Sequence, residues 1–186
     1  MESPMTSPPE REQRFREVYD ATYVDLLRFV RRRVHPSHAE DVVSDAMLVA
    51  WRRLGDLPAD LSGARAWLFG IARNTIRNAR RSEERYAAVA VRIADTPLDP
   101  GDHPELVAHR VDLAAAWPRL SATYQEAIAL SVLDGLSAPE AAVVLGISAT
   151  AFRLRLSRAR RTLRRHVDAA TIDDFPGDQP DLERSL

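Results

Sequence analysis

Residues 136–166 read LSAPEAAVVLGISATAFRLRLSRARRTLRRH, and they predict the architecture of the second half of the chain. Ser137 and Glu140 have the spacing of a capping box, which indicates the start of a short helix. Gly146 suits the left-handed conformation that often ends a helix, and Ser148 can cap the helix that follows. A short helix, a glycine-centred turn and a longer basic helix together predict a helix-turn-helix, whose second helix typically enters the major groove of DNA.

The longer helix is strongly basic, with seven arginines and no acidic residue between positions 153 and 166. An apolar stripe predicts the side that packs on the rest of the domain: Phe152, Leu156, Ala159, Leu163 and Val167. Because arginine can bridge phosphate oxygens or the O6 and N7 of guanine, the remaining sides indicate a duplex-DNA surface. The candidate contacts are Thr150, Arg153, Leu154, Arg155 and Arg158.

Leu154 departs from this basic surface because it places an apolar side chain near the start of the helix, among the arginines. It can contact a thymine methyl group in the major groove. Alternatively, it can pack against a neighbouring helix or a second subunit. The sequence leaves both interpretations open.

The first half of the chain predicts three further helices, because apolar residues recur there at three- and four-residue spacing. We expect them at about residues 14–34, 40–54 and 64–81. The second of these helices exposes a stripe of acidic and apolar residues: Asp41, Asp45, Leu48 and Arg52, flanked by Ser44 and Val49. Such a face is typical of a protein-docking surface, and a simple solvated helix face is the alternative.

The third of these helices carries five arginines and no acidic residue between positions 65 and 81. Arginine, amide and aromatic side chains together suit a nucleic-acid backbone with unstacked bases. The candidate contacts are Trp67, Arg73, Asn74, Arg77 and Arg81. We expect these arginines and Asn74 on the solvent side, whereas a place in the apolar core is the competing interpretation for Trp67.

Turn-forming residues between Arg85 and Pro104 separate the two halves. We therefore expect an all-α protein of two small helical domains joined by a flexible linker, the C-terminal domain being the helix-turn-helix. The expected boundaries are 1–12 for a disordered N-terminus, 13–84 and 106–167 for the domains, 85–105 for the linker, and 168–186 for a disordered acidic tail. A tail that folds back on the basic helix is the alternative to one that only solvates the chain.

Composition excludes several classes of protein. All 26 basic residues are arginine, 27 residues are acidic, the net charge is -1, and there is no cysteine. A disulfide framework, a thiolate metal site and a cysteine nucleophile are therefore excluded. No apolar stretch approaches the roughly 18 residues of a membrane span, and the N-terminus does not resemble a secretory signal. We expect a soluble, cytoplasmic protein whose near-neutral charge conceals two basic segments.

No set of residues predicts catalysis or a cofactor. His35 and His38 lie three positions apart near Glu40 and Asp41, a spacing that could suit a metal. They follow a helix break in a polar turn, however, so we expect no metal there. A binding protein is favoured over an enzyme.

These features, in this order, resemble an extracytoplasmic-function (ECF) sigma factor of bacterial RNA polymerase, in the sigma-70 family. Residues 39–52, AEDVVSDAMLVAWR, resemble the core-binding helix of that family. Residues 64–74, ARAWLFGIARN, resemble its promoter-melting helix. Residues 136–148 with 156–163 resemble its C-terminal helix-turn-helix, so the resemblance covers about residues 13–166.

The resemblance implies promoter-specific transcription initiation, with core RNA polymerase and promoter DNA as partners and an anti-sigma factor as a further candidate. It implies that a polymerase-docking set lies on the second helix: Asp41, Ser44, Asp45, Leu48 and Arg52. The loop 55–62 and the third helix would capture the opened minus-ten strand through Trp67, Arg73, Asn74, Arg77 and Arg81. The last helix would read the duplex minus-thirty-five element through Thr150, Arg153, Leu154, Arg155 and Arg158.

Three residues depart from the family's pattern. Ser44 stands where glutamine is usual, Asp45 where glutamate is usual, and Leu154 where a small polar residue is usual. Contacts to polymerase and promoter preference can differ accordingly. A stand-alone dimeric helix-turn-helix regulator on a palindrome is the alternative function, which explains the second basic segment but not the first.

Overall fold

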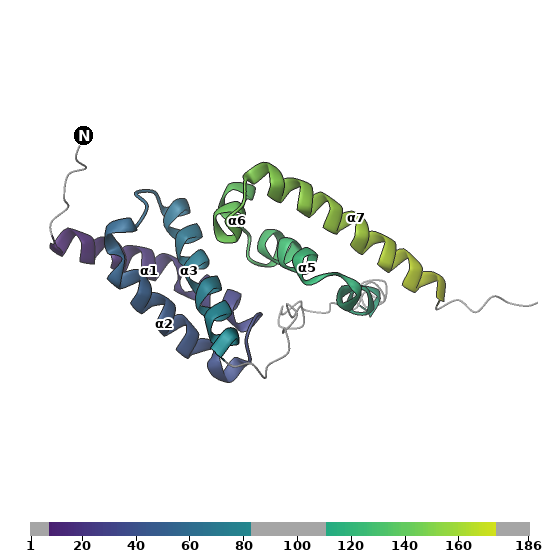
Figure 1. Cartoon of the computed structure of the whole chain (residues 1–186), viewed down its shortest axis with the longest axis horizontal. Helices are drawn as coiled ribbons and strands as arrows, with labels where there is room; N and C mark the ends of the chain where they lie inside the picture. The colour runs from purple at the N-terminus through teal and green to yellow at the C-terminus, as the bar shows by residue number, and fades with distance from the viewer. Residues whose placement is uncertain (1–7, 83–110, 174–186) are drawn as a thin grey trace, which may run out of the picture.

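The computed structural model describes residues 8–82 and 111–173, and within those ranges the chain forms only helices, turns and bends. The first lobe, residues 8–82, consists of α1 (Pro8–Arg31), α2 (Ala39–Arg52) and α3 (Leu61–Ser82) (Figure 1). The second lobe, residues 111–173, contains helical residues 111–116, α5 (Ala122–Ile128), α6 (Ala138–Leu145) and α7 (Ala149–Asp173). The predicted all-α fold with two helical domains is confirmed, and the expected linker at 85–105 lies outside the described residues.

Both outer helices are longer than the sequence predicted. α1 begins at Pro8, so residues 8–12 are helical rather than disordered. Proline is tolerated there because the first turn of a helix needs no backbone donor. α7 continues to Asp173, so residues 168–173 belong to a helix and not to a disordered tail. No glycine or proline interrupts the chain between Ala149 and Asp173, and the helix propagates accordingly.

The caps of the two helices in the helix-turn-helix, and the turn between them, form as predicted. Ser137 and Glu140 form the capping box, in which the Ser137 backbone N–H donates to the Glu140 carboxylate at 2.8 Å. Gly146 adopts the left-handed conformation, with φ 67°, directly after α6. The Ala151 backbone N–H then donates to the Ser148 hydroxyl at 3.1 Å, so Ser148 caps α7.

The helical segment between Ser121 and Asp134 is not uniform. Ser121 caps α5, but Ala129–Leu133 form a π-helical turn, in which the Asp134 N–H donates to the Ala129 carbonyl at 2.9 Å. Such wide turns are rare and frequently mark functional positions. Gly135 then reverses the chain with φ 63°. Leu133 and Asp134 thereby form a helix end that contacts the first lobe.

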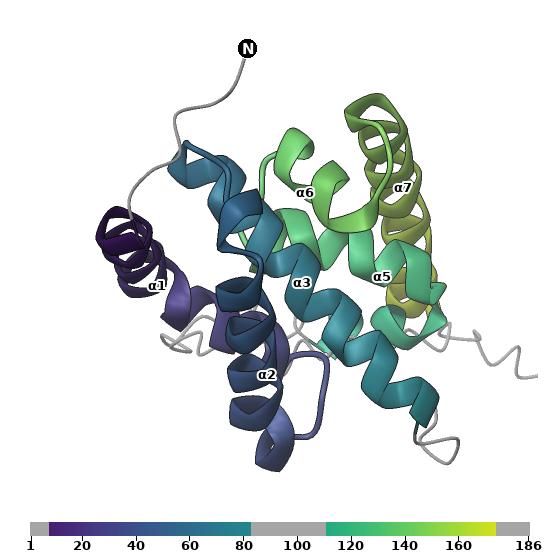
Figure 2. The ribbon, with the colours of Figure 1, turned by 60° about the vertical axis from the view of Figure 1, so that its left-hand side comes forward.

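One continuous apolar core spans the two lobes. Its largest buried side chains include Phe29 and Phe69 from the first lobe and Leu130 and Phe152 from the second. α3 packs along α6, and the two helices lie side by side in both views (Figure 2). At this contact, a Cβ atom added to Gly70 would lie 3.9 Å from the Cα of Val144, an ordinary van der Waals distance. The sequence had not indicated how the lobes are placed.

α7 packs through the stripe that the sequence predicted. Phe152 and Ala159 are fully buried, whereas Leu156, Leu163 and Val167 are partly buried. A smaller cluster around Trp117 and Leu120 supports the middle of the helix. The arginine-bearing sides of α7 consequently face away from the lobe.

Replacing Phe29 with alanine tests the shared core. Phe29 has no exposed surface and its ring centroid lies 4.9 Å from that of Phe69, so its truncation leaves a large cavity. We expect a loss of about 3–5 kcal/mol in the free energy of unfolding, measured by urea denaturation. Val24→Ala is the control, because Val24 lies exposed on the same helix, and it should change stability by less than about 0.5 kcal/mol. Equal losses in the two variants would contradict this placement of Phe29.

Candidate nucleic-acid and protein interfaces

α2 presents all five candidate docking residues on its exposed side: Asp41, Ser44, Asp45, Leu48 and Arg52. Its opposite side is buried against α1 and α3. Leu48 is 47% exposed, an apolar side chain left without cover by the rest of the described chain. The predicted mixture of acidic and apolar surface is therefore present on one helix face.

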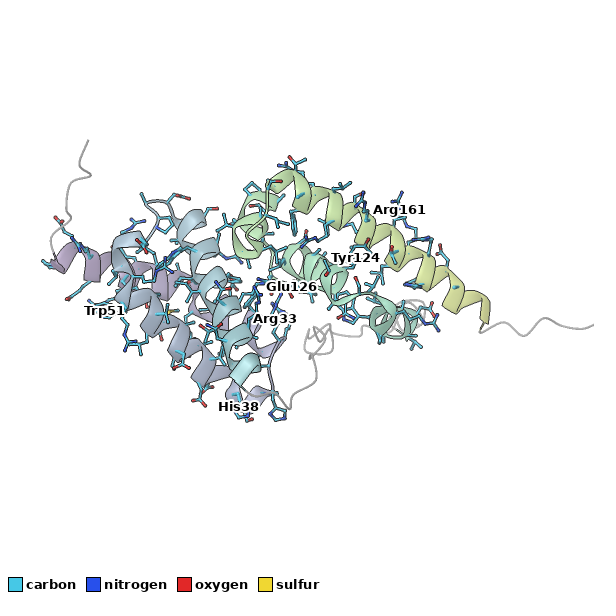
Figure 3. All side chains as sticks on the ribbon, in the orientation of Figure 1. Arg33, His38, Trp51, Tyr124, Glu126 and Arg161 are labelled. Carbon is cyan, nitrogen blue, oxygen red and sulfur yellow. The ribbon has the colours of Figure 1, made fainter. Side chains whose placement is uncertain are left out.

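Trp51 extends this face and was not among the predicted residues. It is 44% exposed, lies at the outer edge of the first lobe and follows Ser44 and Leu48 at helical spacing (Figure 3). Phe15 of α1 holds the ring in an edge-to-face contact with centroids 5.3 Å apart. The spacing of seven residues from Ser44 was the signal that could have revealed it.

The loop before α3 is held by contacts from two sides. Asp60 caps the helix by accepting from the Gly63 N–H at 2.7 Å. The guanidinium group of Arg14, on α1, donates to the carbonyl oxygens of Pro58, at 2.9 Å, and Ala59. A Cβ atom at Gly63 would lie 2.9 Å from the Asp60 carboxylate, so a larger residue there would displace the capping side chain. Residues 58–63 are thus fixed by α1, a connection that sequence reasoning missed.

Trp67 partly fits both interpretations, a place in the apolar core and a contact with nucleic acid. The side chain is half-buried and packs against the apolar core. Arg53 approaches the ring, with its guanidinium carbon 5.9 Å from the centroid. The ring therefore contributes to the core and still presents part of its surface beside a cation.

Arg73 is the candidate on α3 that the sequence misplaced. Asn74 and Arg77 are exposed as expected, but Arg73 is half-buried, with its Nε atom 3.8 Å from the carboxylate of Glu126 in the second lobe. Burial lowers the pKa of the Arg73 guanidinium, the nearby Glu126 opposes that change, and Arg77, Arg33 and Arg155 reinforce it. The expectation of a solvent-side Arg73 failed because the second lobe covers that part of α3. The side chain of Arg81 lies outside the described residues.

The start of α7 exposes most of the predicted duplex contacts: Thr150, Arg153, Leu154 and Arg158. Arg155 is half-buried, and its charge acts on Arg73 across the lobe boundary. Leu154 is 52% exposed, so the interpretation that it packs against a neighbouring helix is wrong for the described chain. Further along α7, Arg161 points away from the first lobe (Figure 3).

A buried carboxylate joins the lobes. The side chain of Asp134 has no exposed surface and accepts from Arg32 at one oxygen and from Arg33, at 2.8 Å, at the other. Arg33 Nε also lies 3.2 Å from the carboxylate of Glu126, and Figure 3 shows these two side chains meeting at the boundary. The sequence carried one signal for this contact: Arg33 lies four residues after the buried Phe29, just beyond the end of α1.

Arg65 adds a second bridge on α3. Its guanidinium group donates to the backbone carbonyl of Asp134 at 2.7 Å and lies 3.4 Å from the carboxylate of Asp25. Glu140, at the start of α6, is 3.9 Å from the same group and accepts from the Ser62 hydroxyl at 2.9 Å. The polar contacts therefore run along the lobe boundary from α1 to α6.

In the described ranges, 8–82 and 111–173, no three histidine, cysteine or acidic side chains gather as a metal site would require. The rings of His35 and His38 are 6.2 Å apart between centroids. None of the described helices is both long and apolar enough to cross a membrane.

Comparison with known families matches both lobes. Residues 18–86 match the model of Sigma-70 region 2, and residues 110–163 match that of Sigma-70, region 4. RNA polymerase sigma factor CnrH of Cupriavidus metallidurans is 36% identical over 141 residues, which cover 70% of this chain and 73% of CnrH. ECF RNA polymerase sigma factor SigL of Mycobacterium tuberculosis is 34% identical over 152 residues, which cover 80% of this chain and 86% of SigL.

Solved structures agree with these matches. CnrH in complex with the cytosolic domain of CnrY aligns with a TM-score of 0.57 and 31% identity, over 85% of this chain and 90% of that one. The sigma factor RpoE in complex with the anti-sigma factor NepR, from Bartonella quintana, aligns with a TM-score of 0.53 and 26% identity. That alignment covers 84% of this chain and 96% of RpoE.

Replacing Arg14 with glutamine tests how the loop before α3 is held. The variant loses the charged hydrogen bonds to the carbonyls of Pro58 and Ala59, each of a kind worth about 1.5–3 kcal/mol. We expect faster amide hydrogen exchange at Gly63 and Ala64, measured by mass spectrometry, with α2 unchanged. Arg16→Gln, at an exposed position on α1, is the matched control. Unchanged protection in the Arg14 variant would refute the role of Arg14.

Proposed function

Because the chain belongs to the ECF sigma factors of the sigma-70 family, we propose that it directs initiation by binding core RNA polymerase and then promoter DNA. The observation that supports this most is the separation of three surfaces on three helices: the exposed face of α2, the polar side of α3 and the start of α7. Such surfaces suit one protein partner and two DNA elements. The proposal includes action in the cytoplasm as a binding factor without catalysis of its own.

The exposed face of α2 is the proposed contact with core polymerase. The acidic side chains of Asp41 and Asp45 orient the chain on the polymerase and raise the rate of association. Leu48 and Trp51 supply apolar area that loses water on binding. Exposed tryptophan is among the residues enriched at energetically dominant interface positions. Trp51 therefore joins Asp41, Ser44, Asp45, Leu48 and Arg52 in the proposed docking set.

α3 and the loop before it are the proposed site for the opened minus-ten strand. Asn74 and Arg77 are exposed and three positions apart on α3, so their amide and guanidinium groups lie on the same side of the helix. The partly exposed ring of Trp67 offers a surface for stacking. The loop is held rigidly by Arg14 and Asp60, which favours the capture of an unpaired base without reorganisation of the backbone.

The start of α7 is the proposed reader of the duplex minus-thirty-five element. Thr150, Arg153 and Arg158 are exposed near the N-terminal end, where recognition helices contact base edges. The exposed side chain of Leu154 suits a thymine methyl group. A dimeric regulator that acts alone is not favoured, because the first lobe matches Sigma-70 region 2.

An anti-sigma protein is a further proposed partner. Two solved relatives are complexes, one with the cytosolic domain of CnrY and one with the anti-sigma factor NepR, and both align over more than four-fifths of this chain. Exposed apolar residues outside the three proposed surfaces, such as Val24 and Val132, provide area that such a partner can cover.

Run-off transcription with purified core polymerase tests the proposed function. The full chain should direct initiation from a defined start site, which start-site mapping then locates. Asp45→Arg should weaken binding to core polymerase by about tenfold or more, since it reverses one charge of the docking set. Asp20→Arg on the exposed side of α1 is the control and should retain activity. A chain that retards duplex DNA alone and never yields transcripts would refute the proposal.

Arg158→Gln tests the proposed reading of duplex DNA. Loss of one guanidinium contact should lower affinity for the mapped minus-thirty-five duplex, with a cost of about 1–3 kcal/mol if Arg158 contacts a base. If it contacts a phosphate, the log–log salt slope should fall by about one instead. Fluorescence anisotropy across a salt series distinguishes the two. Arg164→Gln, further along α7, is the control, and equal effects in both variants would contradict the assignment of Arg158.

A further inference from the structure

Four arginines of the first lobe converge on one segment of the second lobe. They are Arg32, Arg33, Arg65 and Arg73, and we refer to them as the arginine face. The groups that they contact between residues 126 and 134 are carboxylate and carbonyl oxygens. Asp25 and Glu140 are the other carboxylates near this face, both beside Arg65.

The partner oxygens imitate a polyanion. Asp134 and Glu126 contribute carboxylates, and the carbonyls of Leu133 and Asp134 belong to the C-terminal end of a helix, where the helix dipole is negative. Guanidinium groups bind carboxylate and phosphate through the same planar fork of donors. A surface that accepts these oxygens has the chemistry to accept phosphate oxygens.

We call the arrangement in which the two lobes pack together the closed arrangement. It carries free-energy costs that separation of the lobes would relieve. Within the described chain, Arg32 Nε is buried without a hydrogen-bond partner. Arg73 loses water and faces the charges of Arg77, Arg33 and Arg155. Burying ion pairs returns little net free energy, and contacts between domains of one chain are usually reversible.

The arginine face adjoins the proposed minus-ten site. Arg73 belongs to it and directly precedes Asn74, and Arg77 follows one turn later on α3. Arg65 lies two turns before Arg73 on the same helix. A strand held by Asn74 and Arg77 would therefore meet further guanidinium groups once the second lobe has moved away.

We propose that the arginine face is a binding site for nucleic-acid phosphates, and that Glu126 and Asp134 occupy it as intramolecular phosphate surrogates until the lobes separate. The identity of the DNA as promoter DNA rests on the proposed function, whereas the competition between carboxylate and phosphate does not. The free chain then binds DNA weakly, because only the fraction with separated lobes can use the face.

A wedge at Gly70 separates the lobes without changing any charge. A Cβ atom there would already be in van der Waals contact with the Cα of Val144, so we expect the three further heavy atoms of the side chain in Gly70→Met to press against α6. α3 itself should tolerate the change, since methionine has a higher helix propensity than glycine. Glu126→Gln combined with Asp134→Asn removes the two carboxylate charges that occupy the arginine face. This pair of substitutions is an independent second route to separated lobes.

The measurement is anisotropy of a fluorescein-labelled single-stranded oligonucleotide and its duplex, titrated with the full chain over a salt series. The radius of gyration is followed by small-angle X-ray scattering. Both variants should expand the chain and tighten DNA binding by about tenfold or more, as expected when a state populated at roughly 10% or less becomes dominant.

Removal of arginines tests the site itself. Gly70→Met with Arg32→Gln and Arg33→Gln should stay expanded but lose most of the gain in affinity, with a salt slope lower by about one to two. Gly70→Met with Arg16→Gln and Arg28→Gln removes equal charge from α1 outside the face and should keep the gain.

The proposal is overturned if neither route expands the chain, or if expansion occurs without tighter DNA binding. Equal losses from the two arginine pairs would also overturn it, because the effect would then be one of net charge. Run-off transcription by the unaltered chain reports on the proposed function separately, so either idea can fail while the other stands.

Discussion

The buried carboxylate of Asp134 constrains how the two lobes meet. Two guanidinium groups from the turn after α1 must reach its two oxygens, and a third group, from α3, donates to the adjoining backbone carbonyl. Separating only one partner from such a set leaves a buried charge uncompensated, at a cost of about 3–5 kcal/mol. Small shifts of one lobe on the other are thus disfavoured. Complete separation returns every charge to water but exposes the apolar side chains that the two lobes share. The contact therefore specifies one docked arrangement more than it adds stability.

Several local features serve that contact. The π-helical turn Ala129–Leu133 and the left-handed Gly135 end the helix so that Leu133 and Asp134 present their oxygens to the first lobe. The packing of α3 along α6 keeps Arg65 and Arg73 beside their partners in the second lobe. In this chain of net charge -1, part of the arginine charge of the first lobe is neutralised by carboxylates of the second lobe.

Local signals explain what the sequence predicted well. The capping box at Ser137, the turn at Gly146 and the apolar stripe of α7 depend on residues within a few positions of one another. The burial of Arg73 and the role of Arg14 could not be predicted in this way, since their partners are distant in the sequence. The surfaces of α2 and of the start of α7 followed from periodicity alone, except for Trp51, whose exposure depends on its packing against Phe15.

The distance between the lobes, measured with and without core polymerase, tests most directly whether the free chain is closed by the Asp134 contact. The chain has no cysteine, so Ala21→Cys on α1 and Ser157→Cys on α7, both exposed, give two unique sites for fluorescent labels. The account predicts efficient energy transfer in the free chain, lower transfer on adding core polymerase, and low transfer throughout when Asp134→Asn and Glu126→Gln are combined. Low transfer in the unaltered free chain, or transfer unaffected by these substitutions, would contradict it.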